Sequence, residues 1–238
     1  MKKKRYIYIC IFLALALLAG AIFYFAKVRP DQQKKKQHAE AVAQYRAAKM
    51  EKYRQENEKY ADYEVDVAFL GDSLTDGYDL AHYYPQFLVV NRGISGDTTF
   101  DLEGRLQTSV YDLKPKVAVM LIGANNFSTM MDNYERILQG LQENLPDTQI
   151  VLLSLTSMSQ EWGKNNQIAA YNNTRIKKLA ETYGFTFVDL YTPLMDVATG
   201  QIRPEYTTDG GHLTAQGYEV LTATITPVLE ALLTPTTE

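Results

Sequence analysis

Five short apolar runs, alternating with segments of helical character, constrain the fold more than any other feature of this sequence. The runs span residues 65–70, 87–90, 117–122, 150–155 and 185–190. Continuous apolar runs of this length are typical of strands that are buried on both faces of a parallel sheet. The segments expected to be helices span residues 99–112, 134–144, 167–183 and 214–233. This alternation predicts right-handed crossovers and a three-layer α/β/α sandwich.

Unusual polar segments follow three of these runs, and a fourth precedes the last helix. In a doubly wound sheet the loops after the strands share one edge, where α/β folds bind ligands. We therefore expect all four segments to converge there. They are Gly71-Asp72-Ser73-Leu74, Asn91-Arg92-Gly93-Ile94-Ser95-Gly96-Asp97-Thr98, Gly123-Ala124-Asn125-Asn126 and Asp209-Gly210-Gly211-His212.

A serine at this edge has two interpretations. It is either the N-cap of a helix or a nucleophile, and a nucleophile needs a base and a group that orients the base. Asp209 lies three positions before His212, so one turn can hold both side chains on one face. Asp209 would then accept from Nδ1–H of His212, leaving Nε2 to take the proton of Ser73. The alternative is an Asp–His pair that caps the last helix.

The same edge carries candidate donors for an oxyanion. The peptide N–H of Ser73, a glycine N–H and the side-chain amide of Asn125 would together form a three-donor oxyanion hole. Each candidate also has a structural interpretation. Gly93 and Gly96 would permit a tight turn, and Asn125 would cap the helix that follows.

These four segments, in this order, resemble the four sequence blocks of the SGNH (GDSL) hydrolases, from about residue 65 to the C-terminus. The resemblance implies an esterase, a lipase or an acyltransferase with a flavodoxin-like sheet of five parallel strands. It implies a catalytic triad in which Ser73 is the nucleophile, His212 the base and Asp209 the residue that orients His212. It also implies an oxyanion hole. Ser73, Gly96 and Asn125 would form the oxyanion hole, with Gly93 as the reserve candidate. Asn126 departs from the pattern, which often has Asp there.

The loop over residues 91–99 is similar to that of platelet-activating-factor acetylhydrolase catalytic subunits and bacterial short-chain esterases. The segments expected around Ser73 are mostly polar, so we expect a serine esterase that prefers short, acetyl-like acyl groups on a small-molecule or glycan-linked ester. Two alternatives remain: an acyltransferase to cell-wall sugar hydroxyls, and a lysophospholipase or lipase that accepts longer chains. Trp162 would be either a hydrophobic lid or a platform that stacks on a sugar.

The N-terminal part has a different composition. Residues 6–26 carry no charge after a Lys/Arg cluster, and a helix of that length rises about 31 Å, close to the thickness of a bilayer core. We therefore expect residues 1–29 to form a single-pass transmembrane anchor in the cell membrane, with the catalytic domain outside the cell. The alternative is a cleaved signal peptide, with Ala19-Gly20-Ala21 as the cleavage candidate.

Two further segments complete the expected organisation. Residues 30–60 consist mostly of charged and other helix-forming residues, which predicts a helical stalk. The hydrolase domain would then span residues 61–238. The stalk has only a thin apolar stripe, so we expect a monomer, with a stalk-mediated coiled-coil dimer as the alternative.

Composition excludes several classes of function. The net charge of −4 gives no indication of nucleic-acid binding. The sequence has no phosphate-cradling glycine-rich loop followed by Lys-Ser/Thr. Outside the stalk its only histidines are His82 and His212, which lie far apart in the sequence, so a catalytic zinc site is not expected. We predict no metal and no cofactor.

Overall fold

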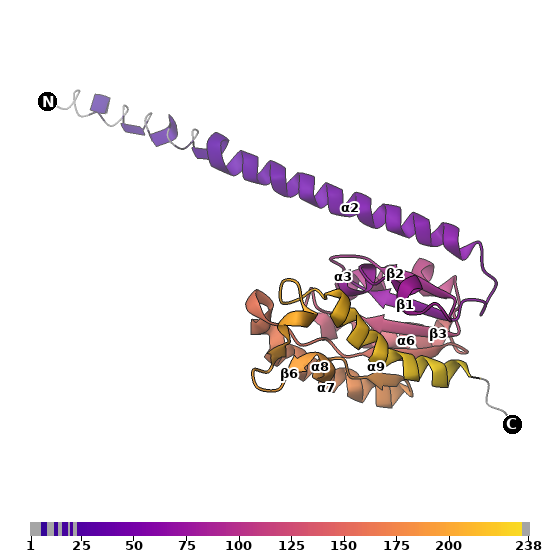
Figure 1. Ribbon diagram of the computed structural model, residues 1–238. Coiled ribbons are helices and arrows are strands. Elements are labelled where there is room, and N and C mark those ends of the chain that lie inside the picture. Colours follow the sequence, from indigo (N-terminus) through magenta and orange to yellow (C-terminus); the bar gives the residue numbers. More distant parts are fainter. Residues whose placement is uncertain (1–5, 9–11, 14–15, 19, 21–22, 235–238) are drawn as a thin grey trace. The chain divides into compact units, whose positions relative to one another are not determined.

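The fold is built around a five-stranded parallel sheet with the order β2-β1-β3-β4-β5 (Figure 1). The computed structural model describes residues 6–8, 12–13, 16–18, 20 and 23–234. The sheet strands are β1 (Val67–Gly71), β2 (Val89–Gly93), β3 (Val117–Leu121), β4 (Gln149–Leu153) and β5 (Thr186–Val188). This strand order is that of flavodoxin-like folds, so the predicted α/β sandwich and its five parallel strands are confirmed.

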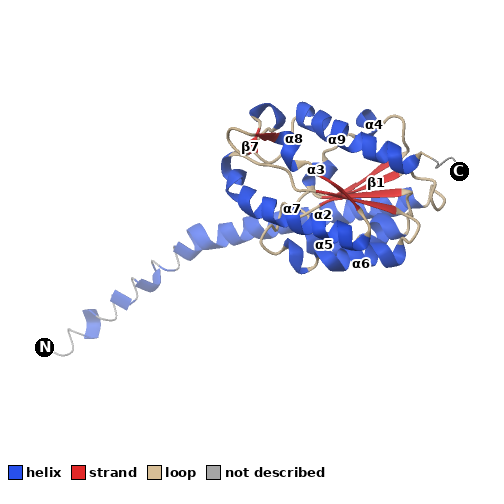
Figure 2. Cartoon of the chain, turned by 90° about the horizontal axis from the view of Figure 1, so that it is seen from below, coloured by secondary structure: helices blue, strands red, loops and turns tan. Residues whose placement is uncertain are grey.

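Helices cover both faces of the sheet (Figure 2). The α-helices are α2 (Arg29–Asn57), α3 (Ser73–Asp76), α4 (Leu80–Tyr83), α5 (Thr99–Glu103), α6 (Tyr134–Asn144), α7 (Asn166–Tyr183), α8 (Tyr191–Leu194) and α9 (Ala215–Leu233). The 3-10 helices are η3 (Met130–Asp132), η4 (Gln160–Asn165) and η5 (Pro204–Tyr206), and the π-helices are η1 (Tyr24–Val28) and η2 (Gln107–Tyr111). A small antiparallel pair, β6 (Met195–Asp196) and β7 (Gln201–Ile202), lies outside the main sheet.

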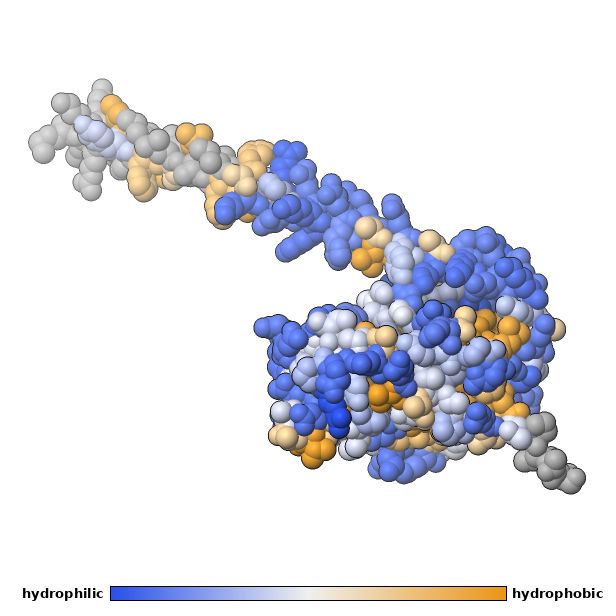
Figure 3. Space-filling model, viewed as in Figure 1, coloured by the Kyte–Doolittle hydropathy of each residue, from blue (hydrophilic) through white to orange (hydrophobic). Residues whose placement is uncertain are grey.

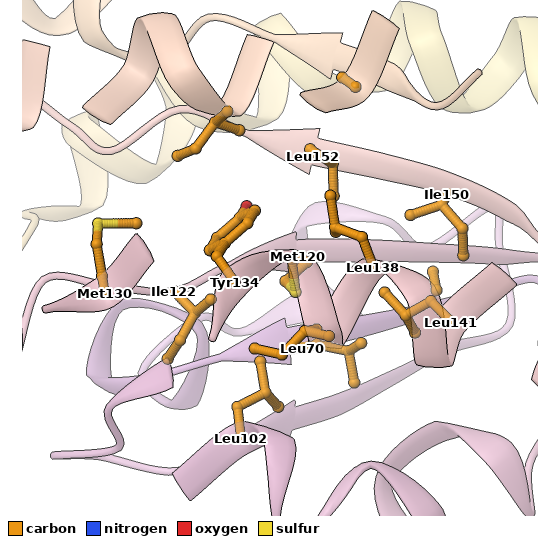
Figure 4. Close-up of a cluster of buried hydrophobic side chains, with 14 of the residues drawn as sticks. Leu70, Leu102, Met120, Ile122, Met130, Tyr134, Leu138, Leu141, Ile150 and Leu152 are labelled. Atoms are coloured by element: carbon orange, nitrogen blue, oxygen red, sulfur yellow. The ribbon is translucent and has the colours of Figure 1, made fainter. Parts of the chain in front are cut away.

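Alternating side chains of the strands divide the core into two layers. Leu70 and Met120 belong to the layer under α5, α6 and α7, whereas Phe69 and Val119 belong to the layer under α4, α8 and α9. Figure 4 shows the first layer, in which leucine, isoleucine, methionine and Tyr134 side chains fill the space between the strands and helices. Burial on both faces is why the two central strands β1 and β3 carry no polar side chain.

One predicted helix is interrupted. The segment 99–112 forms α5 and then the π-helical turn η2, with Gly104 at the C-cap of α5. Glycine has a low helix propensity, which accounts for the break between them. The helices predicted over 134–144, 167–183 and 214–233 occur within one residue of those bounds.

The predicted N-terminal transmembrane helix is wrong. Among the residues that the structure describes, no helix is both long enough and apolar enough to cross a membrane. In this region η1 has only five residues, and α2 is long but rich in Lys, Gln and Glu, so the surface of α2 in Figure 3 is largely hydrophilic. Residues 9–11, 14–15, 19 and 21–22 of the expected span lie outside the described part of the chain.

The chain divides into two compact units, Met1–Lys49 and Met50–Glu238. The second unit therefore includes the last two turns of α2, about ten residues before the boundary expected at residues 60 and 61. Tyr53, in those turns, is 1% exposed. The part of α2 that precedes Met50 carries exposed ion pairs such as Lys36–Glu40.

Candidate active site

Ser73 is the first residue of α3, and only Asp72 separates it from the end of β1. The buried Asp72 is the N-cap of α3, and its side chain accepts from the Leu74 amide at 3.2 Å. The first amides of a helix have no acceptor within the helix, so the Ser73 N–H faces away from α3 as a possible donor. The Ser73 hydroxyl lies 3.1 Å from Nε2 of His212. The strand-to-helix turn therefore presents a hydroxyl to an imidazole that comes from 139 residues further along the chain.

Asp209 and His212 lie in one turn, just before α9. Nδ1 of His212 is 2.7 Å from Oδ2 of Asp209, and the other carboxylate oxygen accepts from the amides of His212 and Gly211 at 2.8 and 2.9 Å. Partial burial raises the pKa of Asp209, but these amide and imidazole hydrogen bonds outweigh it and lower the pKa to about 2. Asp209 is therefore ionised at neutral pH and accepts from Nδ1–H, which leaves the lone pair of Nε2 facing Ser73.

The structure distinguishes the two candidate glycines. The Gly93 amide already donates to Oδ1 of Asn91 at 2.8 Å, and a Cβ atom on Gly93 would lie 2.2 Å from the Asp76 amide nitrogen of α3. Gly93 is thus a packing residue. Gly96 has φ +84° and open space around it, and among the described residues none accepts from its N–H. Its left-handed conformation, which strongly favours glycine, completes a turn in which the Asp97 amide donates to the Ile94 carbonyl at 3.1 Å.

Asn125 connects the third segment to the Gly96 loop. Its side-chain amide donates to the Asp97 carbonyl at 2.9 Å, which leaves its second N–H for another acceptor. Asn125 also lines the same small cavity as Ser73 and His212. Asn126, which departs from the family pattern, bonds instead to Thr99, accepting from its amide at 3.2 Å and donating to its hydroxyl at 2.9 Å.

Two acids next to site residues brace the loops. Asp72 is 1% exposed, and burial raises its pKa to about 6, against the hydrogen bonds from the Leu74 and Ala124 amides. Asp97 is fully buried and accepts from Nε of Arg105 at 2.6 Å. Both carboxylates thus act as hydrogen-bond acceptors that hold the loops. The buried partner of Asp97, Arg105, carries no recognisable signal in the sequence.

A cavity of about 20 Å³ contains Ser73 and His212. Its other lining residues are Leu74, Ala124, Asn125, Thr156, Met158, Trp162 and Gly211. The Trp162 ring packs edge-on against His212, with 6.2 Å between the ring centres. Thr156 and Met158 carry no recognisable signal in the sequence, because they lie in an irregular loop after β4 that has no motif.

A larger cavity, of about 550 Å³, lies beside β5 and α7. None of its lining residues belongs to the predicted site, so we assign the chemistry to the small cavity, which holds a hydroxyl and an imidazole in contact. In the described part of the chain, no group of three or more His, Cys, Asp and Glu side chains is arranged to hold a metal ion.

A parallel α/β sheet with serine, histidine and aspartate side chains in contact at its carboxyl edge is typical of serine hydrolases. Residues 69–220, more than half of the chain, match the GDSL-like Lipase/Acylhydrolase family. The chain belongs to this family and is a carboxylic-ester hydrolase. None of the curated proteins matches the sequence.

Solved structures resemble this chain over nearly their whole length. A Streptococcus pneumoniae protein, provisionally described as a platelet activating factor, has 28% identity and a TM-score of 0.75, covering 83% of this chain and 99% of its own. A GDSL-like lipase from Bacteroides thetaiotaomicron has 25% identity and a TM-score of 0.68, covering 77% and 98%. An acetyl-xylooligosaccharide esterase from Geobacillus stearothermophilus, a mutant form, has 22% identity and a TM-score of 0.58, covering 74% and 98%. This last likeness extends to the fold alone.

Proposed function

We propose that this chain hydrolyses short-chain, acetyl-like esters through an acyl-enzyme formed on Ser73. The observation that carries the proposal is the continuous contact from Ser73 Oγ to His212 Nε2 at 3.1 Å and from His212 Nδ1 to Asp209 at 2.7 Å. A serine hydroxyl becomes an effective nucleophile when an adjacent base takes its proton, and the base is effective when a third group orients it.

The proposed reaction has two steps, acylation of Ser73 and hydrolysis of the acyl-enzyme. His212 Nε2 takes the Ser73 proton while Oγ attacks the ester carbonyl, and the oxyanion that forms collapses as His212 donates the proton to the departing alcohol. Water then gives a proton to His212 and attacks the acyl-enzyme, and Ser73 leaves with that proton. Asp209, with its pKa of about 2, stabilises the imidazolium throughout.

Three donors would stabilise the oxyanion. They are the Ser73 amide, the Gly96 amide and Nδ2 of Asn125. Asn125 is tethered to the Asp97 carbonyl, which adjoins Gly96, so the two donors are held relative to each other. Donors fixed in advance cost no reorganisation when charge develops, and this is why such sites are effective.

The size of the cavity supports the short acyl group. The space beside Ser73 is small, about 20 Å³, and is lined by Leu74, Met158 and Trp162, so it suits a small acyl group better than a long chain. Each buried CH₂ contributes about 0.8 kcal/mol, so a chain that cannot enter gains nothing from its length. This favours an esterase over a lipase or lysophospholipase.

The proposal is tested by replacing Ser73 and by varying the ester. Ser73→Ala should lower kcat to near background in a folded protein, and a serine-directed phosphonate should label the wild-type protein at Ser73 only. kcat/KM for p-nitrophenyl esters should decline from acetate or butyrate towards palmitate. More than a few per cent of activity in Ser73→Ala rejects the mechanism, whereas a steady rise beyond octanoate rejects the short-chain preference.

The ester's alcohol part and the cellular location stay predictions. Trp162 beside His212 suits a sugar or another flat, partly apolar group. Partition of the acyl-enzyme between water and added alcohols would distinguish hydrolysis from acyl transfer. The monomeric state and the location outside the cell also stay predictions.

A further inference from the structure

The last two turns of α2 pack against the back of the loop that carries Gly96. Tyr53, in these turns, is 1% exposed, and its hydroxyl donates to the Gly93 carbonyl at 2.6 Å. The guanidinium of Arg92 lies over the Tyr53 ring, 4.7 Å from its centre. Arg92 also donates to Glu56 and, at 3.0 Å, to Asn57. The end of α2 therefore holds Arg92 and Gly93, the last two residues of β2, from which the loop that carries Gly96 begins.

These contacts hold a buried charge. Arg92 is 0% exposed, and its Nε is buried with no hydrogen-bond partner among the described residues. Burial lowers the pKa of Arg92, and the hydrogen bond and charge of Glu56 oppose this. A buried guanidinium is tolerated when it is paired and hydrogen-bonded, so α2 supplies what keeps Arg92, and hence this part of the loop, in place.

The same loop is fixed from the opposite side by Arg105 and by α3. Arg105 donates to the carbonyls of Arg92 and Gly71, both at 2.9 Å, and to the carboxylate of Asp97 at 2.6 Å. In front of the loop, Asp76 of α3 accepts from the amide of Ser95 at 3.0 Å and from its hydroxyl at 2.6 Å. Gly93 is thus clamped between the hydroxyl of Tyr53 and the backbone of α3.

We propose that Tyr53 is a positioning residue for the oxyanion hole, acting through the Gly93 carbonyl on the direction of the Gly96 amide. Gly96 lies three residues after the clamped carbonyl and completes the turn that Ile94 and Asp97 close. A rotation of the Gly93–Ile94 peptide would tilt that turn, and a donor misplaced by about 1 Å costs up to 10²-fold in rate. This inference rests on the proposed role of Gly96 in the mechanism above. It assigns to α2 a part in catalysis, although α2 contributes no side chain to the cavity.

The test compares two tyrosine-to-phenylalanine variants in the full chain. Tyr53→Phe removes only the hydroxyl that holds Gly93. Tyr84→Phe is the matched control, because it removes another buried tyrosine hydroxyl, which contacts that of Tyr78 at 3.0 Å.

Tyr53→Phe should lower kcat for p-nitrophenyl acetate about 10-fold, with KM within twofold of wild type. Affinity for a trifluoromethyl ketone, whose adduct with Ser73 carries an oxyanion, should weaken by a similar factor. The pH profile should not move, since His212 is untouched, and Tyr84→Phe should keep the wild-type kcat at a similar loss of Tm.

The outcomes separate this inference from the proposed function. If the phosphonate does not label wild-type Ser73, the proposed function fails whatever Tyr53 does. If labelling succeeds and folded Tyr53→Phe keeps full kcat, or if Tyr84→Phe slows the enzyme equally, the positioning role is overturned. If Tyr53→Phe folds poorly, Glu56→Gln serves instead; it should lower kcat roughly threefold by loosening Arg92, and an unchanged kcat in that folded variant is equally decisive.

Discussion

The two halves of the active site are held in place in different ways. Asp209 and His212 occupy one exposed turn, with side chains about half exposed, and the hydrogen bonds of the Asp209 carboxylate, which orient the base, reach residues two or three positions away. The Gly96 loop is held instead by side chains that are almost fully buried. Arg92, Asp97 and Arg105 are 0%, 0% and 4% exposed, and their partners lie up to 36 residues away.

This difference indicates what each half requires. The base must exchange protons with substrate and water, so it lies at the surface, and a short turn with two amide donors is enough to orient it. The oxyanion donors must keep their direction while charge develops, and buried, hydrogen-bonded groups hold direction better than exposed ones. Substitutions in the two halves should therefore differ in how they divide their effects between activity and stability.

The largest effect should come from the exposed half and should fall on activity alone. His212→Ala should lower kcat by at least about 10⁴-fold, because Ser73 loses its base. Its Tm should stay within a few degrees of wild type, since an exposed side chain is removed. Enzyme assays and thermal melts on the same samples measure both. A folded His212→Ala protein with substantial activity would show that another group takes the Ser73 proton.

In the buried half, Arg105→Met should act mainly on stability. It leaves the Asp97 carboxylate buried without its guanidinium, which costs about 3–5 kcal/mol of unfolding free energy. Arg136→Met is the control, because its ion pair with Glu103 is 55% and 29% exposed, and an exposed pair contributes about 0–1 kcal/mol. Urea unfolding at pH 7 measures both. Equal losses in the two variants would mean that the buried network is no more important to stability than a surface pair.

Asn125→Ala, at the junction of the two halves, should reduce kcat by on the order of 10²–10³ with little change in stability, as loss of one oxyanion donor does. Its neighbour Asn126 is the control. Asn126→Ala removes the bonds to Thr99 rather than a donor to substrate, so it should lower Tm more than Asn125→Ala does and kcat less. The reverse pattern would assign the donor role to Asn126 and break the comparison.

The local half was visible in the sequence and the long-range half was not. The spacing of Asp209 and His212 and the position of Ser73 after an apolar run both follow from local geometry. The choice of Gly96 over Gly93 rested on the family resemblance. The physical reason for it was not visible in the sequence, because it lies in the hydrogen bond from the Gly93 amide to the Asn91 side chain. Tyr53 and Glu56 look like ordinary residues of a charged helix, so composition gave no sign that they belong to the compact unit. Apolar composition over residues 6–26 predicted a transmembrane helix, whereas in the part of the chain that the structure describes no helix is both long enough and apolar enough to cross a membrane.

The smallest effect concerns Asp72, which lies beneath both halves, and it appears in the pH dependence of stability. The folded protein raises the pKa of Asp72 from 3.8 to about 6, so between those values the folded state binds more protons than the unfolded state. Stability therefore falls as pH rises from 4 to 6, by on the order of 2 kcal/mol. The contribution of Asp209 has the opposite sign and is lost only below about pH 4, because its carboxylate has a pKa of about 2 in the folded protein.

Asp72→Asn should remove the decline in stability above pH 4 while leaving the loss of stability below pH 4. Urea unfolding of both proteins at pH 3, 4, 5, 6 and 7 measures this. Parallel curves for the two proteins would show that Asp72 is ionised throughout, which would make it a permanent negative charge beside His212.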